Sequence, residues 1–291
     1  MEPKLIADYR CHTGEGPLWH PDEERVYWVD PPRGRLFRYD PTSGDHELCY
    51  ETDVIGHFTI EADGALLLFR PDDGRIERWD HDTVETVIEE VPVEQGIQFN
   101  DVIADPRGRV FCGSLPTEDH PGRLFRLDTD GTLTELESEC GLPNGMGFTL
   151  DRRSFYFTDW AEGTIYRYDY DQATGAITDP EPVIEPAGEG SPDGMTVDAE
   201  GHVWSAMWDG GRIVRFSPDG EAVDVVSFPA RKVSSVTIGG PDYDVAFVTT
   251  ALAAGFDDPG SREQEGEGAG AFFEVELGVK GVPEYRSRIG L

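Results

Sequence analysis

The sequence predicts an all-β protein folded as a six-bladed β-propeller. A seven-residue phrase recurs six times along the chain, and each copy alternates apolar with polar residues. No stretch shows sustained helical periodicity, and short turn sequences separate the strand-like runs. Because the repeats extend over almost all of the 291 residues, we expect a single propeller domain, residues 1–291.

The recurring phrase begins with glycine and continues as a half-buried strand. Its copies are GRLFRYD at 34–40, GRIERWD at 74–80, GRLFRLD at 122–128, GTIYRYD at 163–169, GRIVRFS at 211–217 and the degenerate GAFFEVE at 270–276. Successive copies start 40 to 59 residues apart, and two further strand-like runs precede most of them. A unit of this length and content matches a propeller blade. An open solenoid would need polar caps, and a β-sandwich would not repeat one strand phrase six times.

Turn sequences separate the strands within each repeat. The segments ADG, DPRG, DTDG, DAEG and SPDG supply the left-handed positions that tight hairpins require. The longest interruption, residues 255–268, is polar and acidic. We expect it to form an exposed, mobile loop between strands of the last repeat.

The charge balance is strongly acidic. The chain has 58 Asp and Glu residues against 24 Lys and Arg residues, a formal net charge of −34. This excess is typical of a halophilic protein, whose self-repulsion is screened by salt, and an acidic mesophilic protein is the alternative. Nucleic acids and anionic membranes are excluded as partners, because binding to phosphates needs basic patches that the sequence lacks.

The chain carries no recognisable signal for export or membrane insertion. Its first residues, MEPKLIADYR, lack the basic and apolar regions of a signal peptide, and no apolar run approaches the ~20 residues of a membrane span. The four cysteines form no CxxC pair, so we expect reduced, mostly buried thiols. These features indicate a soluble cytoplasmic protein, and we expect a monomer or a weak homo-oligomer.

Oxygen-bearing side chains recur at one position of the repeat, just before the innermost strand of each blade. In a propeller these positions converge on one mouth of the axial channel. They are occupied by Glu15, His57, Asn100 with Asp101, Asn144, Asp193, and Ser234 or Ser235. Each residue alone is compatible with an ordinary turn. Turns do not require oxygen-bearing side chains at the same position of successive repeats, so their recurrence at the start of the blades indicates a shared site. Carboxylates and carboxamides suit a hard divalent cation such as Ca²⁺, with water completing its shell. The sequence therefore predicts a metal site at one mouth of the central channel.

Several motifs give the chain a resemblance to a known family. They are GEGPLW, FNDVIADPRGRVFCGS, LPNGMGF, FTDW, SPDGMTVD, SVTIGG and VTTA, and the similarity runs from TGEGPLW to the closing GVKGVPE. With these motifs the sequence resembles the regucalcin–gluconolactonase family, also called the senescence marker protein family. Its members are six-bladed propellers with one divalent metal in the channel mouth, and many open sugar lactones. The resemblance implies that Glu15, Asn144 and Asp193 ligate the metal and that Asn100 contacts the substrate or the outer shell of the metal.

One motif departs from the family pattern. The third blade usually carries R-x-N-D-G, whereas this chain has Gln98-Phe99-Asn100-Asp101-Val102. Gln98 thus replaces the arginine that helps to hold the sugar hydroxyls, which leaves the identity of the lactone open. We expect residues 113–122 to overhang the pocket and to take over part of this recognition.

The resemblance implies a metal-dependent hydrolase that opens an aldonolactone to the aldonic acid, as a gluconolactonase or a pentonolactonase does. The expected cofactor is one divalent cation, Ca²⁺ foremost, with Mg²⁺, Mn²⁺, Zn²⁺ and Fe²⁺ as alternatives. Asp193 is the expected general base, and Asn100 is expected to orient the substrate by donating from its amide. The partner is a small-molecule lactone. Two alternatives stay open: a phosphotriesterase-like hydrolase on the same scaffold and a non-catalytic calcium-binding propeller. A strictosidine-synthase-like lyase would need a differently flanked catalytic glutamate and a largely apolar pocket, which the sequence does not show.

Overall fold

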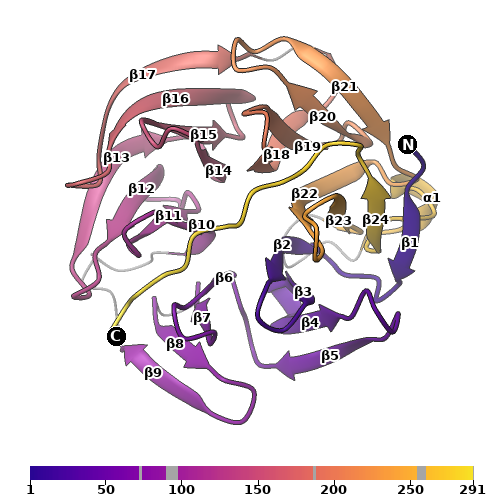
Figure 1. The fold of residues 1–291 in the computed structure, drawn as a ribbon, viewed down its shortest axis with the longest axis horizontal. Coiled ribbons are helices and arrows are strands. Elements are labelled where there is room, and N and C mark those ends of the chain that lie inside the picture. Colours follow the sequence, from indigo (N-terminus) through magenta and orange to yellow (C-terminus); the bar gives the residue numbers. More distant parts are fainter. Residues whose placement is uncertain (72–73, 90–97, 186–187, 254–259, 291) are drawn as a thin grey trace.

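A computed structural model describes residues 1–290 with the exception of 72–73, 90–97, 186–187 and 254–259. Within this part of the chain the strands form six four-stranded sheets, and all strand pairs within the sheets are antiparallel. The sheets are arranged as blades around a central axis, as Figure 1 shows. The predicted six-bladed β-propeller is confirmed.

Each blade is built from consecutive strands that run from the axis outward. The first three blades, from innermost to outermost strand, are β2 (Glu15–His20), β3 (Arg25–Asp30), β4 (Arg35–Tyr39) and β5 (His46–Glu51); β6 (His57–Ile60), β7 (Leu66–Phe69), β8 (Ile76–Trp79) and β9 (Val84–Ile88); and β10 (Phe99–Ala104), β11 (Val110–Ser114), β12 (Gly122–Leu127) and β13 (Leu133–Cys140). The last three are β14 (Pro143–Phe148), β15 (Ser154–Asp159), β16 (Thr164–Asp171) and β17 (Ala176–Ile184); β18 (Ser191–Val197), β19 (Val203–Trp208), β20 (Arg212–Phe216) and β21 (Ala222–Ser227); and β22 (Lys232–Gly239), β23 (Val245–Ala251), β24 (Phe272–Glu276) and β1 (Lys4–Ala7).

The recurring phrase forms the third strand of every blade, β4, β8, β12, β16, β20 and β24. The burial of the strands follows from this order. The second strands, such as β11, are buried on both faces, because they lie between neighbouring blades. The outermost strands β5 and β9 are largely exposed, so they carry charged side chains. The phrase therefore lies towards the outer part of its own blade, one strand in from the edge.

The hydrophobic core is divided among the interfaces between neighbouring blades. Trp28 of the first blade stacks on Phe272 of the last, with ring centroids 4.1 Å apart. Comparable clusters fill the other interfaces around the ring. The ring is closed by the N-terminal strand β1, which pairs with β24 as the outermost strand of the last blade. Both ends of the chain are thus required to complete one sheet.

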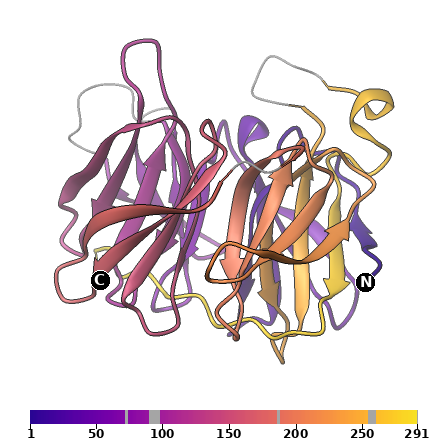
Figure 2. The same ribbon diagram turned by 90° about the horizontal axis from the view of Figure 1, so that it is seen from above.

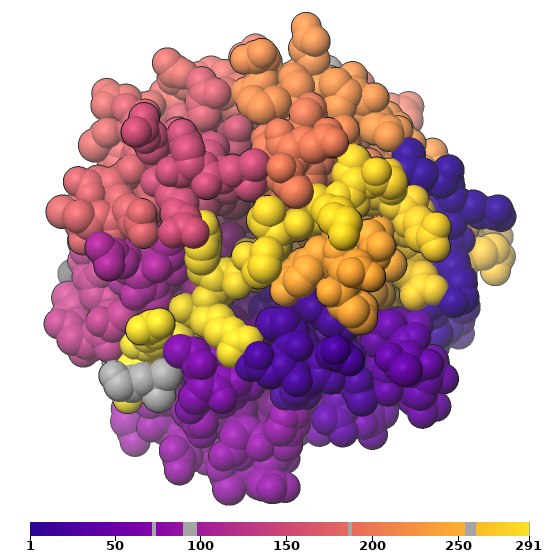
Figure 3. All heavy atoms as spheres, viewed as in Figure 1, coloured from indigo at the N-terminus to yellow at the C-terminus, as the bar shows by residue number. Residues whose placement is uncertain are grey.

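The C-terminal residues 278–290, which we call the strap, cross one face of the ring over the axis (Figures 1 and 3). Short β-bridges join the strap to the second and fifth blades at Ser287 and Gly281. Arg286 pairs with Asp22 of the first blade at 2.6 Å, and Tyr285 packs against Phe148 of the fourth. Because the strap also contacts the third and sixth blades through backbone hydrogen bonds, it joins all six.

A short helix modifies one expectation about the loops. The second half of the interruption at 255–268 contains α1 (Arg262–Glu265), which lies on the face opposite the strap (Figure 2). Glu265 is only 7% exposed and pairs with Lys232, so this half is packed on the propeller rather than mobile, whereas residues 255–259 lie outside the described residues.

All four cysteines are free thiols; three are buried and Cys49 is half-buried, as predicted. Among the described residues no helix is long and apolar enough to cross a membrane.

Candidate active site

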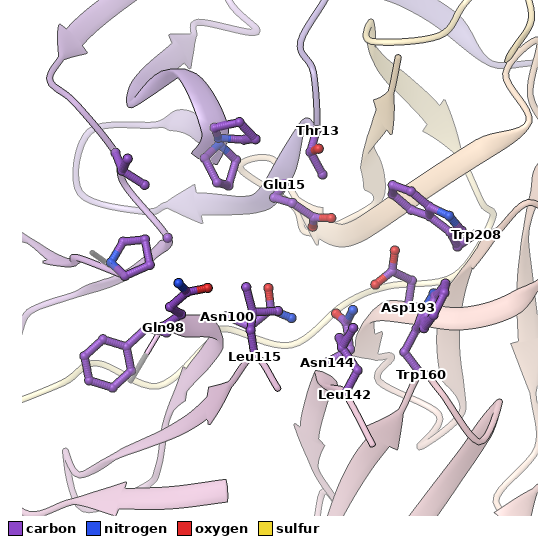
Figure 4. Close-up of a pocket in the computed structure, with 16 residues that line it drawn as sticks. Thr13, Glu15, Gln98, Asn100, Leu115, Leu142, Asn144, Trp160, Asp193 and Trp208 are labelled. Atoms are coloured by element: carbon purple, nitrogen blue, oxygen red, sulfur yellow. The ribbon is translucent and has the colours of Figure 1, made fainter. Parts of the chain in front are cut away.

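A cavity of about 380 Å³ lies at the mouth of the channel where the innermost strands begin, which we call the entrance. The strap covers the opposite mouth (Figure 3). The cavity is lined by all five residues to which the sequence assigned roles: Glu15, Gln98, Asn100, Asn144 and Asp193. Figure 4 shows the carboxylates of Glu15 and Asp193 directed towards the same space, with Asn144 and Asn100 beside them. Residues that are almost 180 positions apart in the sequence therefore meet in one site, as the repeat predicts.

A β-bulge lies at the start of the innermost strand in five of the six blades. The register shifts occur at Glu15–Leu18, Phe99–Val102, Pro143–Met146, Pro192–Met195 and Val233–Ser235. Bulges are frequent next to active sites, where they redirect a side chain. Here each of the polar residues at the base of the cavity lies within or at the edge of a bulge, which explains how a strand residue can point along the axis.

Two glycines allow the innermost strands to approach closely. A Cβ atom at Gly145 would lie 2.3 Å from the backbone oxygen of Asp193, and one at Gly194 would lie 2.1 Å from Oγ of Ser235. Real Cβ atoms do not come this close to backbone oxygen, so glycine is required at position 145. The close contact brings Asn144 next to Asp193.

The carboxylates at the base of the cavity repel one another in a buried setting. Burial raises the pKa of Glu15 well above its usual value, and the nearby charges of Asp193 and Asp101 raise it further. Burial likewise raises the pKa of Asp193, with Asp101 as the second cause, and the amide of Asn144 opposes the increase. A cluster of this kind is stabilised by a positive charge among the carboxylates.

Two buried oxygen atoms of this cluster lack any hydrogen-bond partner. They are Oε2 of Glu15 and Oδ1 of Asp193, whose residue is only 2% exposed. Buried carboxylate oxygens without partners are rare unless an ion or water satisfies them. The donor set therefore fits one hard cation. It is a mixed set, since the described residues contain no group of three His, Cys, Asp or Glu side chains placed to hold a metal.

The two asparagines are fixed by hydrogen bonds to the backbone. Nδ2 of Asn100 donates to the carbonyl oxygen of Pro143 at 2.8 Å, which sets the plane of the amide. One amide N–H of Asn100 is thus committed to the protein, and its oxygen and second N–H stay available. Oδ1 of Asn144 accepts from the backbone N–H of Gly145 at 3.0 Å and retains a second lone pair.

The other residues at the same repeat position do not line this cavity. His57, Asp101 and Ser235 line a second, smaller cavity of about 60 Å³ deeper along the axis. Nε2 of His57 lies 3.5 Å from Oδ1 of Asp101. Ser234 donates to the backbone oxygen of Gly14 and supports the loop before Glu15. Of the residues at 113–122, only Leu115 lines the cavity at the entrance.

An apolar rim surrounds the polar base, and sequence reasoning missed it. Six residues of the rim lie at the end of the second strand of a blade or within two residues after it: Pro31, Pro32, Pro71, Leu115, Trp160 and Trp208. Val54 and Leu142 complete the rim. The second strand runs antiparallel to the first, so it ends at the mouth where the first begins. The position at the end of the second strand of each repeat could have identified the rim residues from the sequence.

Comparisons with known proteins agree with the fold and the motifs. The family model "SMP-30/Gluconolactonase/LRE-like region" matches residues 13–252. The chain is 50% identical to the pentonolactonase XacC of Haloferax volcanii over 294 residues, with 100% of both chains covered. It is 30% identical to regucalcin of Gallus gallus over 97% of each chain. Among solved structures, a luciferin-regenerating enzyme superposes with a TM-score of 0.85 at 26% identity, covering 99% of this chain and 100% of the other.

Proposed function

Because the chain belongs to the SMP-30/gluconolactonase/LRE-like family, we propose that it is a hydrolase that opens the ester bond of a sugar lactone, with a pentonolactone as substrate. The match to a pentonolactonase over the full length of both chains supports the substrate. The observation that carries the proposal is the convergence of Glu15, Asn144 and Asp193 at the base of one cavity, with two unpartnered carboxylate oxygens.

The residues at the base have the oxygen donors that a divalent cation requires, and Ca²⁺ is the ion that we propose. Glu15 and Asp193 would contribute carboxylate oxygens, and Asn144 its amide oxygen. A cation bound there supplies a Lewis acid for the lactone carbonyl.

The protein side chains position the reactants and move the proton. Asp193 accepts a proton from the water that attacks the carbonyl carbon. The bond between the acyl carbon and the ring oxygen then breaks, and the ring oxygen leaves as an alcohol by taking the proton that Asp193 accepted. Asn100, whose amide plane is fixed by Pro143, orients a ring hydroxyl or the carbonyl through its oxygen and its second N–H. The product is an aldonate anion.

Gln98 replaces the charged arginine of the family pattern with a neutral amide at the edge of the cavity. An amide donates fewer hydrogen bonds than a guanidinium, so recognition of distal hydroxyls is weaker on this side. This agrees with a five-carbon lactone rather than a longer hexonolactone.

The test is lactone opening by the chelated protein before and after addition of single divalent metals, followed as acid release on a panel of aldonolactones. We expect activity only with metal, and best on pentonolactones. Asp193→Asn should retain metal and lose turnover by about 10²–10⁴-fold, because an amide is no base at neutral pH.

The chain offers a matched control. The tetrapeptide Ser-Pro-Asp-Gly occurs at 191–194 and again at 217–220, where Asp219 lies exposed in a hairpin turn. Asp219→Asn should leave activity unchanged. Full activity of Asp193→Asn would refute the assigned base, and a wild-type protein that opens no lactone with any metal would refute the function.

A further inference from the structure

The cavity at the entrance has two layers with different chemistry. Polar side chains from the starts of the innermost strands form the base, and apolar side chains from the ends of the second strands form the rim. A lactone whose carbonyl lies at the base must therefore project the opposite side of its ring towards the rim.

Two tryptophans form one continuous part of this rim. Trp160 and Trp208 belong to the neighbouring fourth and fifth blades, and Figure 4 shows both side chains next to Asp193. Gln98 lies on the other side of the cavity in the same view. The substrate thus meets aromatic faces beside the catalytic carboxylate and an amide further away.

Trp208 is held by a buried ion pair. Nζ of Lys232 lies 5.8 Å from the centroid of the Trp208 ring and 2.6 Å from Oε1 of Glu265. Lys232 and Glu265 are 5% and 7% exposed, and neither lines the cavity. A cation so placed fixes the ring and leaves its cavity side to the ligand.

Trp160 is held by the carboxylate next to it in sequence. Asp159 accepts hydrogen bonds from the backbone N–H groups of Gly141 at 2.6 Å, Leu142 at 3.1 Å and Ala161 at 3.1 Å. The backbone on both sides of Trp160 is therefore fixed. A binding surface that is rigid before the ligand arrives loses less conformational entropy on binding.

The two rings discriminate between polar and apolar substituents. A hydroxyl pressed against an indole face loses its water without gaining a partner, whereas a methyl group in the same place gains from burial. Sites that read a hydroxyl do so with polar groups, and they reject the analogue that lacks it by large factors. The rim residues carry no such group apart from the indole N–H of each tryptophan. The hydroxyl of Thr13, which also lines the cavity, lies near Glu15 in Figure 4.

We propose that Trp160 and Trp208 are specificity-determining residues that receive an apolar substituent on the lactone ring. The enzyme accordingly opens 5-deoxypentono-1,4-lactones, which carry a methyl group on carbon 4, in preference to the parent lactones, which carry a hydroxymethyl group there. This inference rests on the proposed lactonase function. The reaction is the same hydrolysis: water adds to the acyl carbon, the acyl–oxygen bond breaks, and the oxygen on carbon 4 leaves with a proton.

The test compares kcat/KM for a pentono-1,4-lactone and its 5-deoxy counterpart, mixed in one reaction so that the ratio does not depend on the fraction of active protein. We expect the deoxy lactone to be preferred by about 10- to 200-fold, the range that apolar pockets achieve for one small group. Trp208→Gln and Trp160→Gln place an amide at the rim and should lower this ratio to one or below. Trp208→Phe keeps an aromatic face and should retain most of the preference for the deoxy lactone.

The outcomes separate this inference from the function on which it rests. A wild-type ratio at or below one, with the parent lactone opened, overturns the inference and leaves the lactonase intact. A preference that persists in both glutamine variants overturns the role of the tryptophans. If neither lactone is opened with any metal, the proposed function fails and the inference fails with it.

Discussion

Replacing Glu284 with glutamine is expected to stabilise the protein at pH 8 and to change its stability little at pH 5. Glu284 lies on the strap, and its side chain lines the deeper cavity together with His57 and Asp101. Its only hydrogen bond among the described residues comes from Oγ1 of Thr196 at 3.4 Å. Burial raises the pKa of Glu284 from an ordinary 4.5 to about 7, against a small opposing effect of Thr196.

The sign of the effect follows from proton binding. The folded state holds the proton of Glu284 more tightly than the unfolded state, so between pH ~4.5 and ~7 folding stability falls as the pH rises. A difference of ~2.5 pKa units corresponds to at most ~3.4 kcal/mol, at 1.36 kcal/mol per unit. Since the side chain is only half-buried, solvent screening reduces the effect, and we expect the free energy of unfolding to fall by about 1–3 kcal/mol over this pH range.

The assay is urea unfolding of the wild type and Glu284→Gln at pH 5 and pH 8 in one fixed salt concentration. Glutamine retains the contact with Thr196 and removes the charge. The free energy of unfolding of the variant, relative to that of the wild type, should therefore be about 1–3 kcal/mol higher at pH 8 than at pH 5. The control is Glu276→Gln, an exposed glutamate shortly before the strap that changes the net charge equally. If the difference between Glu284→Gln and the wild type is the same at both pH values, the carboxyl keeps its ordinary pKa and the reasoning is wrong.

Four other results are expected. Asn100→Ala should keep its bound metal, measured by elemental analysis, and raise KM for lactones; loss of the metal would assign Asn100 to the metal site instead. Gln98→Arg restores the family residue and should increase kcat/KM on gluconolactone relative to a pentonolactone, and an unchanged ratio would exclude Gln98 from substrate recognition. The melting temperature should rise between low and molar KCl, where the Debye length is ~3 Å, because the net charge is −34; equal melting temperatures would indicate an ordinary acidic protein. Asp105 is fully buried and accepts from Arg109 at 2.6 Å, so Asp105→Ala should lower the free energy of unfolding by about 3–5 kcal/mol, and a loss below 1 kcal/mol would contradict that estimate.

The repeat made the polar base of the cavity predictable from sequence. The two copies of Ser-Pro-Asp-Gly show why local sequence would have failed: Asp193 lies at the start of an innermost strand, whereas Asp219 lies in a hairpin turn. Only the position within the repeat separates them. The same reasoning placed His57 at the site, but the blade that contains it has no bulge at its innermost strand, and the side chain lies deeper along the axis.

Other features depend on contacts that no local pattern encodes. The rim residues Trp160 and Trp208 are apolar; Trp160 follows a buried strand and Trp208 ends one, so in the sequence they resemble core residues. The packed half of the 255–268 segment depends on the pair between Lys232 and Glu265, which are far apart in the chain and are buried together. The strap has no counterpart in the other repeats, and its path over the axis could not be inferred from periodicity.

The pairing of β1 with β24 has a consequence for synthesis on the ribosome. Lys4 meets Glu274 only after 270 further residues have been made, which at ~5–20 residues per second takes roughly 14–54 s. During this interval the nascent chain has an unpaired N-terminal strand and an incomplete ring of blades. Unpaired strand edges of this kind favour aggregation. The net charge of −34 makes neighbouring unfinished chains repel one another, so the acidic composition opposes aggregation before the protein is complete as well as afterwards.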